Sequence, residues 1–235
     1  MYKNKKILGV ITARGKSKGI PKKNIKLLAE KPLIYYTIKA AKESKFLNYF
    51  LVSTDDKEIA EIAKSYGAEI PFMRPAELAT DTAPTLPVLK HALDFAEKYK
   101  NCRFDYILTL HPTNPLRTAQ DIDNAIELAK INPDATSIIS ICEIGIPPQK
   151  IKKIINGKLV DYYQREIEGT LRQKYSEKIY RRNEAIYLTK RKTLIQGSIF
   201  GEKIIPYIML PEKSTAIDNI LDFELAEFLF KKQNL

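Results

Sequence analysis

An alternation of short apolar runs with amphipathic segments, in the first third of the chain, constrains the fold most. Apolar runs at 7–13 and 49–53 suit strands that are buried on both faces. Apolar residues recur at helical spacing within 32–44 and 59–67, and a short run at 69–72 favours a third strand. Strand, helix, strand, helix, strand is typical of a mostly parallel sheet with helices on both faces. The sequence therefore predicts an α/β fold.

The same alternation continues along the rest of the chain. We expect further strands at 106–110, 136–142, 180–189 and 204–210, and further helices at 88–99, 121–130 and 223–232. Pro206 favours an edge position for the last strand. The last helix is expected to turn Leu225, Phe228 and Leu229 toward the core. These elements fit one Rossmann-like domain, 1–235.

One stretch, 146–182, departs from this pattern. Two prolines open it, and Asn156-Gly157 predicts a tight turn between strands at 150–155 and 158–163. The residues after the hairpin are polar and cationic. We expect this stretch to leave the sheet as an inserted hairpin arm, with a solvated basic hairpin that has no partner as the alternative.

The opening strand runs directly into a cationic loop at 14–24. The loop holds two glycines, one proline and five cations, namely Arg14, Lys16, Lys18, Lys22 and Lys23. Ligands of parallel sheets bind beyond the carboxyl ends of the strands, where backbone N–H and ammonium groups can offset the charge of a polyphosphate. The Walker spacing and the dinucleotide pattern G-x-G-x-x-G are both absent. A basic surface loop without a ligand is the alternative.

This loop resembles the signature of the sugar-activating cytidylyltransferases, Ala-Arg-x-x-Ser-Lys-Gly-Ile/Leu-Pro-x-Lys-Asn. The similarity is greatest to the CMP-sialic acid synthetase (acylneuraminate cytidylyltransferase) family, including the CMP-legionaminic and CMP-pseudaminic acid synthetases. The matching residues are Ala13, Arg14, Ser17, Lys18, Gly19, Ile20, Pro21, Lys23 and Asn24. Further similarity lies at 74–83, 112–117 and 183–187.

The resemblance implies that the chain binds CTP and transfers its CMP group to a nine-carbon 2-keto acid sugar. It implies nucleotide contacts from Ala13, Arg14, Ser17, Lys18, Asn24, Arg74, Ala83 and Thr85. Arg14, Lys18 and Lys23 would be catalytic, because they would stabilise the pentacoordinate phosphorus and the leaving pyrophosphate. His111, Lys150, Arg172, Gln173 and Tyr187 would bind the sugar, and the arm would contribute to a homodimer.

Three positions depart from the family pattern. His111 replaces a glutamine, and an imidazole, unlike an amide, can carry charge near neutral pH. Glu184 replaces a glycine and would be strained if the backbone there needs an unusual angle. Ala216 replaces the first of two carboxylates that hold Mg²⁺ in the family, which leaves Asp218 as the expected ligand. Asp222 is either a substitute ligand or a helix cap.

Charge and cysteine content limit the partners and the compartment. A net charge of +11 predicts attraction to anions, and nucleic acid is one candidate, but no RNA-binding motif is present, so we expect no nucleic acid partner. Two cysteines without metal or disulfide spacing favour the cytoplasm. No run approaches membrane-spanning length, and the short apolar run at the start is not expected to be a signal peptide. The alternatives are a Kdo-type substrate and a family member whose turnover is impaired by Ala216.

Overall fold

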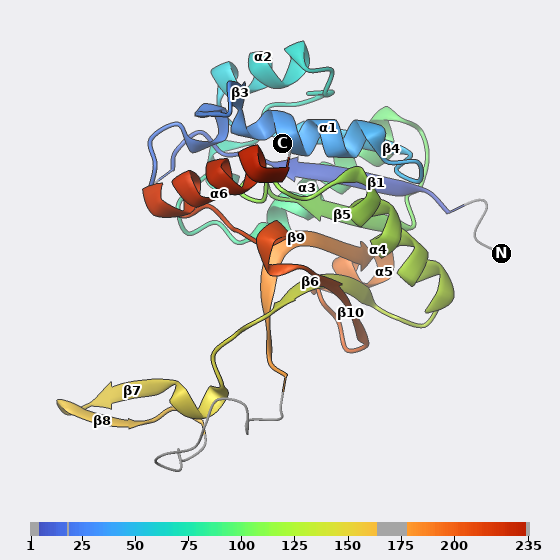
Figure 1. Ribbon diagram of the computed structural model, residues 1–235. Coiled ribbons are helices and arrows are strands. Elements are labelled where there is room, and N and C mark those ends of the chain that lie inside the picture. The colour runs from blue at the N-terminus through green and yellow to red at the C-terminus, as the bar shows by residue number, and fades with distance from the viewer. Residues whose placement is uncertain (1–4, 18, 164–177, 234–235) are drawn as a thin grey trace.

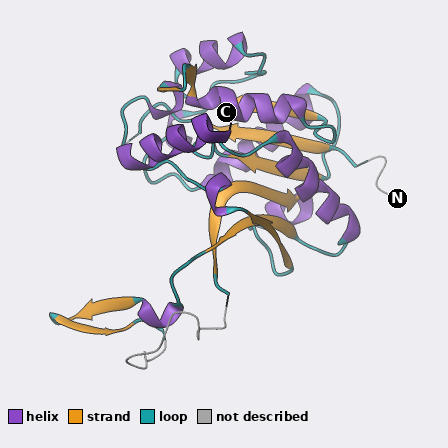
Figure 2. Ribbon diagram, in the orientation of Figure 1, coloured by secondary structure: helices purple, strands orange, loops and turns teal. Residues whose placement is uncertain are grey.

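The structure is a computed structural model that describes residues 5–17, 19–163 and 178–233. A central sheet has the strand order β10-β6-β9-β5-β1-β4, and Figure 2 shows it as one layer between helices. Its strands are β1 (Ile7–Thr12), β4 (Tyr49–Ser53), β5 (Tyr106–Leu110), β6 (Ser137–Glu143), β9 (Tyr180–Lys190) and β10 (Ile204–Met209). The helices are α1 (Leu33–Glu43), α2 (Lys57–Ser65), α3 (Thr85–Tyr99), α4 (Ala119–Ile131), α5 (Arg191–Ile195) and α6 (Ile220–Gln233).

The sheet is mostly parallel, as the sequence predicts. β1 pairs in parallel with β4 and β5, and β10 pairs in parallel with β6. β9 lies between β5 and β6 and is antiparallel to both. The predicted edge position of Pro206 is confirmed, because β10 is the outer strand.

Helices cover both faces of the sheet. The side chains of β1 alternate between the two faces, so the apolar core has two parts. Ile7 and Ile11 pack with α1, α2 and α4 on one face. Leu8 and Val10 pack with α3 and with Leu194 of α5 on the other face. Successive side chains of a strand point to opposite faces, so a continuous apolar run serves two helix layers. None of the described helices has both the length and the apolar character that a bilayer span needs.

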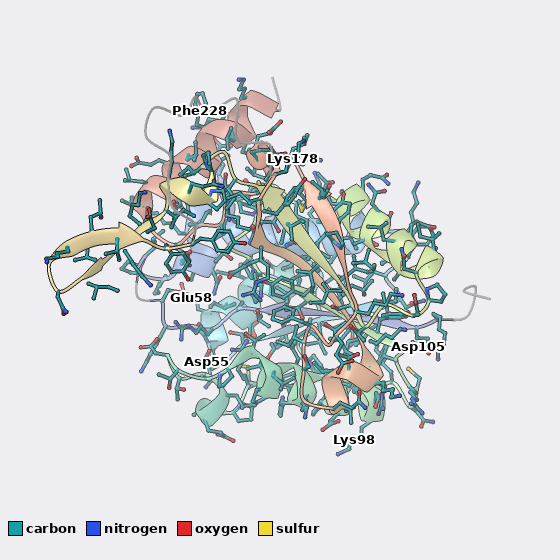
Figure 3. All side chains as sticks on the ribbon, turned by 90° about the horizontal axis from the view of Figure 1, so that it is seen from below. Asp55, Glu58, Lys98, Asp105, Lys178 and Phe228 are labelled. Atoms are coloured by element: carbon teal, nitrogen blue, oxygen red, sulfur yellow. The ribbon has the colours of Figure 1, made fainter. Side chains whose placement is uncertain are left out.

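The last helix, α6, packs differently from the prediction. Phe223 and Ala226 are buried against Ile20, Leu28, Leu33, Tyr36 and Ile217. Leu225 is 49% exposed and Phe228 is 63% exposed, so the predicted apolar face was wrong for these two residues; Phe228 lies at the edge of the molecule in Figure 3. Apolar residues occur all around α6, so periodicity alone does not identify the face that packs.

Most predicted boundaries agree with the structure to within a few residues, and one predicted strand was wrong. The run at 69–72 forms only an isolated parallel bridge between Leu51 and Glu69. Two short strands, β2 (Leu27–Leu28) and β3 (Lys31–Pro32), form a small ribbon before α1.

The predicted hairpin is confirmed. β7 (Lys152–Ile155) and β8 (Lys158–Asp161) form their own antiparallel pair around the turn at Asn156 and Gly157, both of which have positive φ. Figure 1 shows the pair projecting away from the body, with the sheet leading to it through β6 and back through β9. The hairpin makes no strand pairing with the central sheet.

Candidate active site

A cleft of about 480 Å³ opens beyond the carboxyl ends of β1 and β5. In Figure 3, Asp55, which follows β4, and Asp105, which precedes β5, mark the two ends of the sheet. Nine of the fifteen predicted site residues line this one cleft: Arg14, Ser17, Lys23, Asn24, Arg74, Ala83, Thr85, His111 and Asp218. Lys18, Arg172 and Gln173 lie outside the described residues. Ala13, Lys150 and Tyr187 are described but do not line the cleft.

Backbone contacts hold the 14–24 loop in place at the cleft. The Ala13 N–H donates to the Ser53 carbonyl at 3.0 Å, and the Gly15 N–H donates to Asp55 Oδ1 at 2.9 Å. The buried Asn24 donates from Nδ2 to the Arg14 carbonyl at 2.9 Å. Asn24 therefore ties the two ends of the loop together, in addition to lining the cleft.

Lys23 joins this loop to a segment from the far end of the chain. Its Nζ donates to the Ile217 carbonyl at 2.6 Å and lies 3.5 Å from Asp218 Oδ1. Gly19 touches the same segment, and a Cβ at that position would collide with the carbonyl oxygen of Asp218. The loop therefore needs glycine there to approach Asp218 closely.

Arg14 reaches across the cleft to the loop before α3. Its Nη1 lies 3.0 Å from Asp81 Oδ1 and donates to the Thr80 carbonyl at 3.1 Å. Asp81, Thr80 and Thr12 line the cleft too, but the sequence did not single them out as site residues. Thr80 and Asp81 could have been found from the family segment at 74–83, in which they lie between two predicted contacts.

Arg74 is buried and holds the same loop against β4. Its Nε donates to Ser53 Oγ at 3.0 Å and its Nη2 to the Ser53 carbonyl at 2.5 Å. Burial lowers the pKa of Arg74 to about 10, so the guanidinium stays charged at neutral pH. The Arg74 guanidinium thus holds the loop against β4 and also lines the cleft.

The first turn of α3 opens on the cleft. Thr85 and Val88 line the cleft from this turn, and no side chain among the described residues caps the N-terminus of the helix. The N–H groups of a first helical turn have no intrahelical partners and carry partial positive charge. This end of α3 is therefore suited to hydrogen-bond acceptors of a ligand.

His111 lies at the end of β5, on the floor of the cleft. Its Nδ1 is 3.0 Å from Thr12 Oγ1, and the ring of Tyr187 meets it edge-on with 5.9 Å between centroids. Burial, assisted by the nearby Arg117, lowers the pKa of His111 to about 4. The ring is therefore neutral near pH 7, which excludes the charged form that the sequence left open.

Arg117 holds the loop that follows β5 through contacts with β9 and α1. The buried guanidinium donates from Nη1 to the Ala185 carbonyl at 2.8 Å and from Nη2 to Thr37 Oγ1 at 2.8 Å. Burial lowers its pKa to about 10. The same charge that fixes the loop to β9 and α1 therefore also disfavours protonation of His111.

Asp218 is the described carboxylate best placed for a cation. Its side chain is 81% exposed at the cleft and has Lys23 beside it. Asp222 is engaged as a cap, because its Oδ2 accepts from the N–H groups of Asp218 and Asn219 at 2.9 and 3.1 Å. No three Asp, Glu, His or Cys side chains gather as a metal site in the described part of the chain. Mg²⁺ fits here only as a site with one protein carboxylate, completed by phosphate oxygens and water.

The predicted sugar residues do not converge as the nucleotide residues do. Tyr187 is 7% exposed and acts from behind His111 rather than in the cleft. Lys150 lies in the short helical turn Pro148–Lys150 at the base of the hairpin. Within the described residues, the cleft gathers more of the predicted nucleotide residues than of the predicted sugar residues.

Glu184 confirms the expected strain. Its φ is +62°, in a bulge of β9 opposite the register shift between Ile139 and Ile141. The bulge is held by Asn183, which accepts from Ser140 Oγ at 2.5 Å and donates to Ser214 Oγ at 2.9 Å. A glutamate therefore occupies a left-handed conformation that glycine adopts without cost.

Comparison with known proteins adds an independent observation. A family model described as Cytidylyltransferase matches residues 8–234. Post-translational flagellin modification protein B of Campylobacter coli is 38% identical over 230 residues, 97% of each chain. CMP-N,N'-diacetyllegionaminic acid synthase of Legionella pneumophila is 36% identical, covering 96% of this chain and 97% of that protein.

Solved structures support the fold. A CMP:2-keto-3-deoxy-manno-octonic acid synthetase complexed with CTP superposes with a TM-score of 0.71. The superposition covers 97% of this chain and 99% of that chain, at 16% sequence identity. At this identity the likeness concerns the fold alone.

Proposed function

The chain belongs to the cytidylyltransferase family, and we propose that it activates a nine-carbon 2-keto acid sugar with CTP, giving the CMP-sugar and pyrophosphate. The sugar would be of the sialic, legionaminic or pseudaminic acid type, because similar proteins are named as synthases of such CMP-sugars. One observation carries the proposal: predicted site residues from four parts of the chain, 14–24, 74–85, His111 and Asp218, converge on one cleft at the carboxyl edge of the sheet.

The proposed reaction is a direct displacement at phosphorus. The anomeric hydroxyl of the sugar attacks the α-phosphorus of CTP, the bond to the β-phosphate oxygen breaks, and pyrophosphate leaves with the electron pair. Such a transfer depends on positioning and on neutralising charge, and it needs no enzyme nucleophile. Arg14 and Lys23 would neutralise the phosphates from the loop, and Lys18 is assigned the same role by the family signature.

Asp218 would hold Mg²⁺ together with phosphate oxygens and water. Bound there, the cation would polarise the α-phosphate and lower the pKa of the attacking hydroxyl. Lys23 lies within 3.5 Å of the same carboxylate. Mg²⁺ and Lys23 would therefore together neutralise the negative charge of the Asp218 carboxylate and of the phosphates.

The sugar would bind between His111 and the arm. A neutral imidazole offers one N–H donor and one acceptor, and Thr12 occupies Nδ1, so Nε2 would face the sugar. The carboxylate of the sugar needs a cation, which Lys150 or Arg172 of the arm would supply, and Gln173 would add a neutral hydrogen-bonding group. We propose that the arm acts across a homodimer in the cytoplasm, which the exposed Ile154 and Leu159 support.

The test is a pyrophosphate-release assay of the purified chain with Mg²⁺ and a matrix of substrates. Sialic, legionaminic and pseudaminic acids and Kdo are each combined with CTP, ATP, GTP and UTP. We expect turnover with CTP and at least one nine-carbon acid. Preference for Kdo would support the alternative substrate, and absence of pyrophosphate from every pair would support a family member impaired by Ala216.

A further inference from the structure

Both catalytic cations described at the cleft are already paired with carboxylates that line the same cleft. Arg14 Nη1 lies 3.0 Å from Asp81 Oδ1, and Lys23 Nζ lies 3.5 Å from Asp218 Oδ1. The two pairs come from three different loops. The cations are therefore not free charges awaiting a polyanion, and each must change partners when phosphates arrive.

The pair of Arg14 and Asp81 is the more informative of the two, because the proposed function gives Asp218 a role in metal binding and gives Asp81 none. The side chains of Arg14 and Asp81 are 32% and 39% exposed. Arg14 also donates to the Thr80 carbonyl, so its head is held at the 80–81 turn by two contacts. An ion pair as exposed as this one is weak enough to be exchanged by a ligand of higher charge.

The geometry points to Asp81 as a residue that sets the affinity of the cleft for polyphosphate. Its carboxylate holds Arg14 while the cleft is empty, is displaced from Arg14 by the triphosphate, and returns to Arg14 when pyrophosphate leaves. This inference rests on the proposed function, since it assigns Arg14 to the phosphates that become pyrophosphate. Asp81 thereby lowers the affinity for CTP and pyrophosphate and speeds the release of product.

If Arg14 exchanges Asp81 for phosphates, removing the charge of Asp81 should strengthen the binding of some ligands more than that of others. In Asp81→Asn, Arg14 loses its ionic partner and the repulsion of the phosphates disappears. Both changes tighten the binding of ligands that reach Arg14, by roughly threefold to tenfold. CMP lacks the β- and γ-phosphates, so its affinity should stay within about twofold, a smaller change than the ion pair supplies.

The experiment is calorimetric titration of CTP, pyrophosphate and CMP into the full chain, in EDTA and at two salt concentrations. The variants are wild type, Asp81→Asn, Asp81→Glu and Glu77→Gln. Glu77→Gln removes the same charge from an exposed position of the same loop that does not line the cleft. We expect tighter CTP and pyrophosphate binding only in Asp81→Asn, with a steeper salt dependence.

A double-mutant cycle completes the test. In the Arg14→Gln background the gain from Asp81→Asn should be smaller, because only the lost repulsion of the phosphates remains once the exchange through Arg14 is removed. Unchanged or weaker pyrophosphate binding in Asp81→Asn, an equal gain for CMP, or an equally large gain without Arg14 would overturn the inference. Failure of the wild-type chain to bind CTP both in EDTA and with Mg²⁺ added would instead overturn the proposed function.

Discussion

The 14–24 loop and the β7–β8 hairpin are both cationic segments that leave the sheet, but they differ in how they contact the rest of the chain. The loop is held by contacts from β4, from Asp55 and from the segment at 217–218. The hairpin has Ile154 at 74% and Leu159 at 70% exposure, directly opposite each other across its two strands.

The difference indicates which parts of the site one chain can complete by itself. A two-stranded hairpin is marginally stable alone in water, and exposed apolar residues on it mark an interaction surface. The loop needs no second chain to take its shape. We therefore expect nucleotide binding to depend on one chain, and sugar binding to depend on two. Four predictions, beside that for Asp81, test this difference between the loop and the hairpin.

Lys23→Ala has the largest expected effect. Loss of one preorganised cation at the phosphates should lower turnover by about 100-fold or more, with little change in the urea midpoint. Lys22→Ala is the matched control, because Lys22 is exposed and pairs with Glu58 at 2.5 Å. Pyrophosphate release within about threefold of wild type in Lys23→Ala would refute its catalytic role and weaken the contrast.

The hairpin variant Ile154→Asp with Leu159→Asp comes second. Charges in the middle of an apolar contact should convert a dimer to monomers, as measured by light scattering during gel filtration. The affinity for CTP should stay within about twofold, since ΔΔG for sites outside the contact is usually near zero. Lys158→Asp, at the tip of the same hairpin, is the control. A monomeric wild type, or loss of CTP binding in the variant, would show that the regions are not independent.

His111→Gln should change a pH dependence rather than the fold. The folded state lowers the pKa of His111 from 6.5 to about 4, so its contribution to stability is complete above pH 6.5 and is lost as the pH falls toward 4. Urea titrations should show a smaller loss of stability over this range in His111→Gln than in wild type.

The control for this change is His91→Gln, which retains His111 and so retains the slope. These two are the only histidines in the chain. Equal slopes in wild type and His111→Gln would show that the imidazole is not held neutral in the folded state.

Glu184→Gly has the smallest expected effect and is a gain. Relief of the left-handed backbone conformation at φ +62° should stabilise the body by ~1 kcal/mol. Urea denaturation measures this, and Glu224→Gly, on an exposed part of α6, should destabilise by a comparable amount. A Glu184→Gly variant less stable than wild type would mean that the side chain makes contacts that outweigh the strain.

Local sequence pattern determined much of the fold. The strands at 49–53 and 106–110 agree with the structure residue for residue, because a short apolar run of this kind packs as a strand between two layers of helices. The Asn-Gly turn of the hairpin was likewise readable, since two positive φ angles select those residues. Residues of the family signature line much of one cleft, because the signature follows one strand and one loop.

Predictions from local sequence pattern were wrong or incomplete where the same pattern was compatible with several arrangements of the chain. The run at 69–72 has strand composition, yet in the described residues it forms a single bridge, from Glu69 to Leu51 of β4. In α6, apolar residues surround the helix, and only the position of Ile217 and Leu28 decides that Phe223 and Ala226 are buried. The pairing of Arg14 with Asp81 joins two loops and has no local signature.

The alternation of elements, the inserted hairpin and the resemblance to the family could be predicted from the sequence, since each follows from periodicity or spacing within one segment. Which charged groups become neighbours depends on the tertiary structure. Lys23 and Ile217 are 194 positions apart and become neighbours because the segment that follows the outer strand β10 crosses back over the end of the sheet, where the Ile217 N–H donates to the Thr113 carbonyl. Contacts of that range depend on topology and packing, and the burial they create also sets the neutral state of His111.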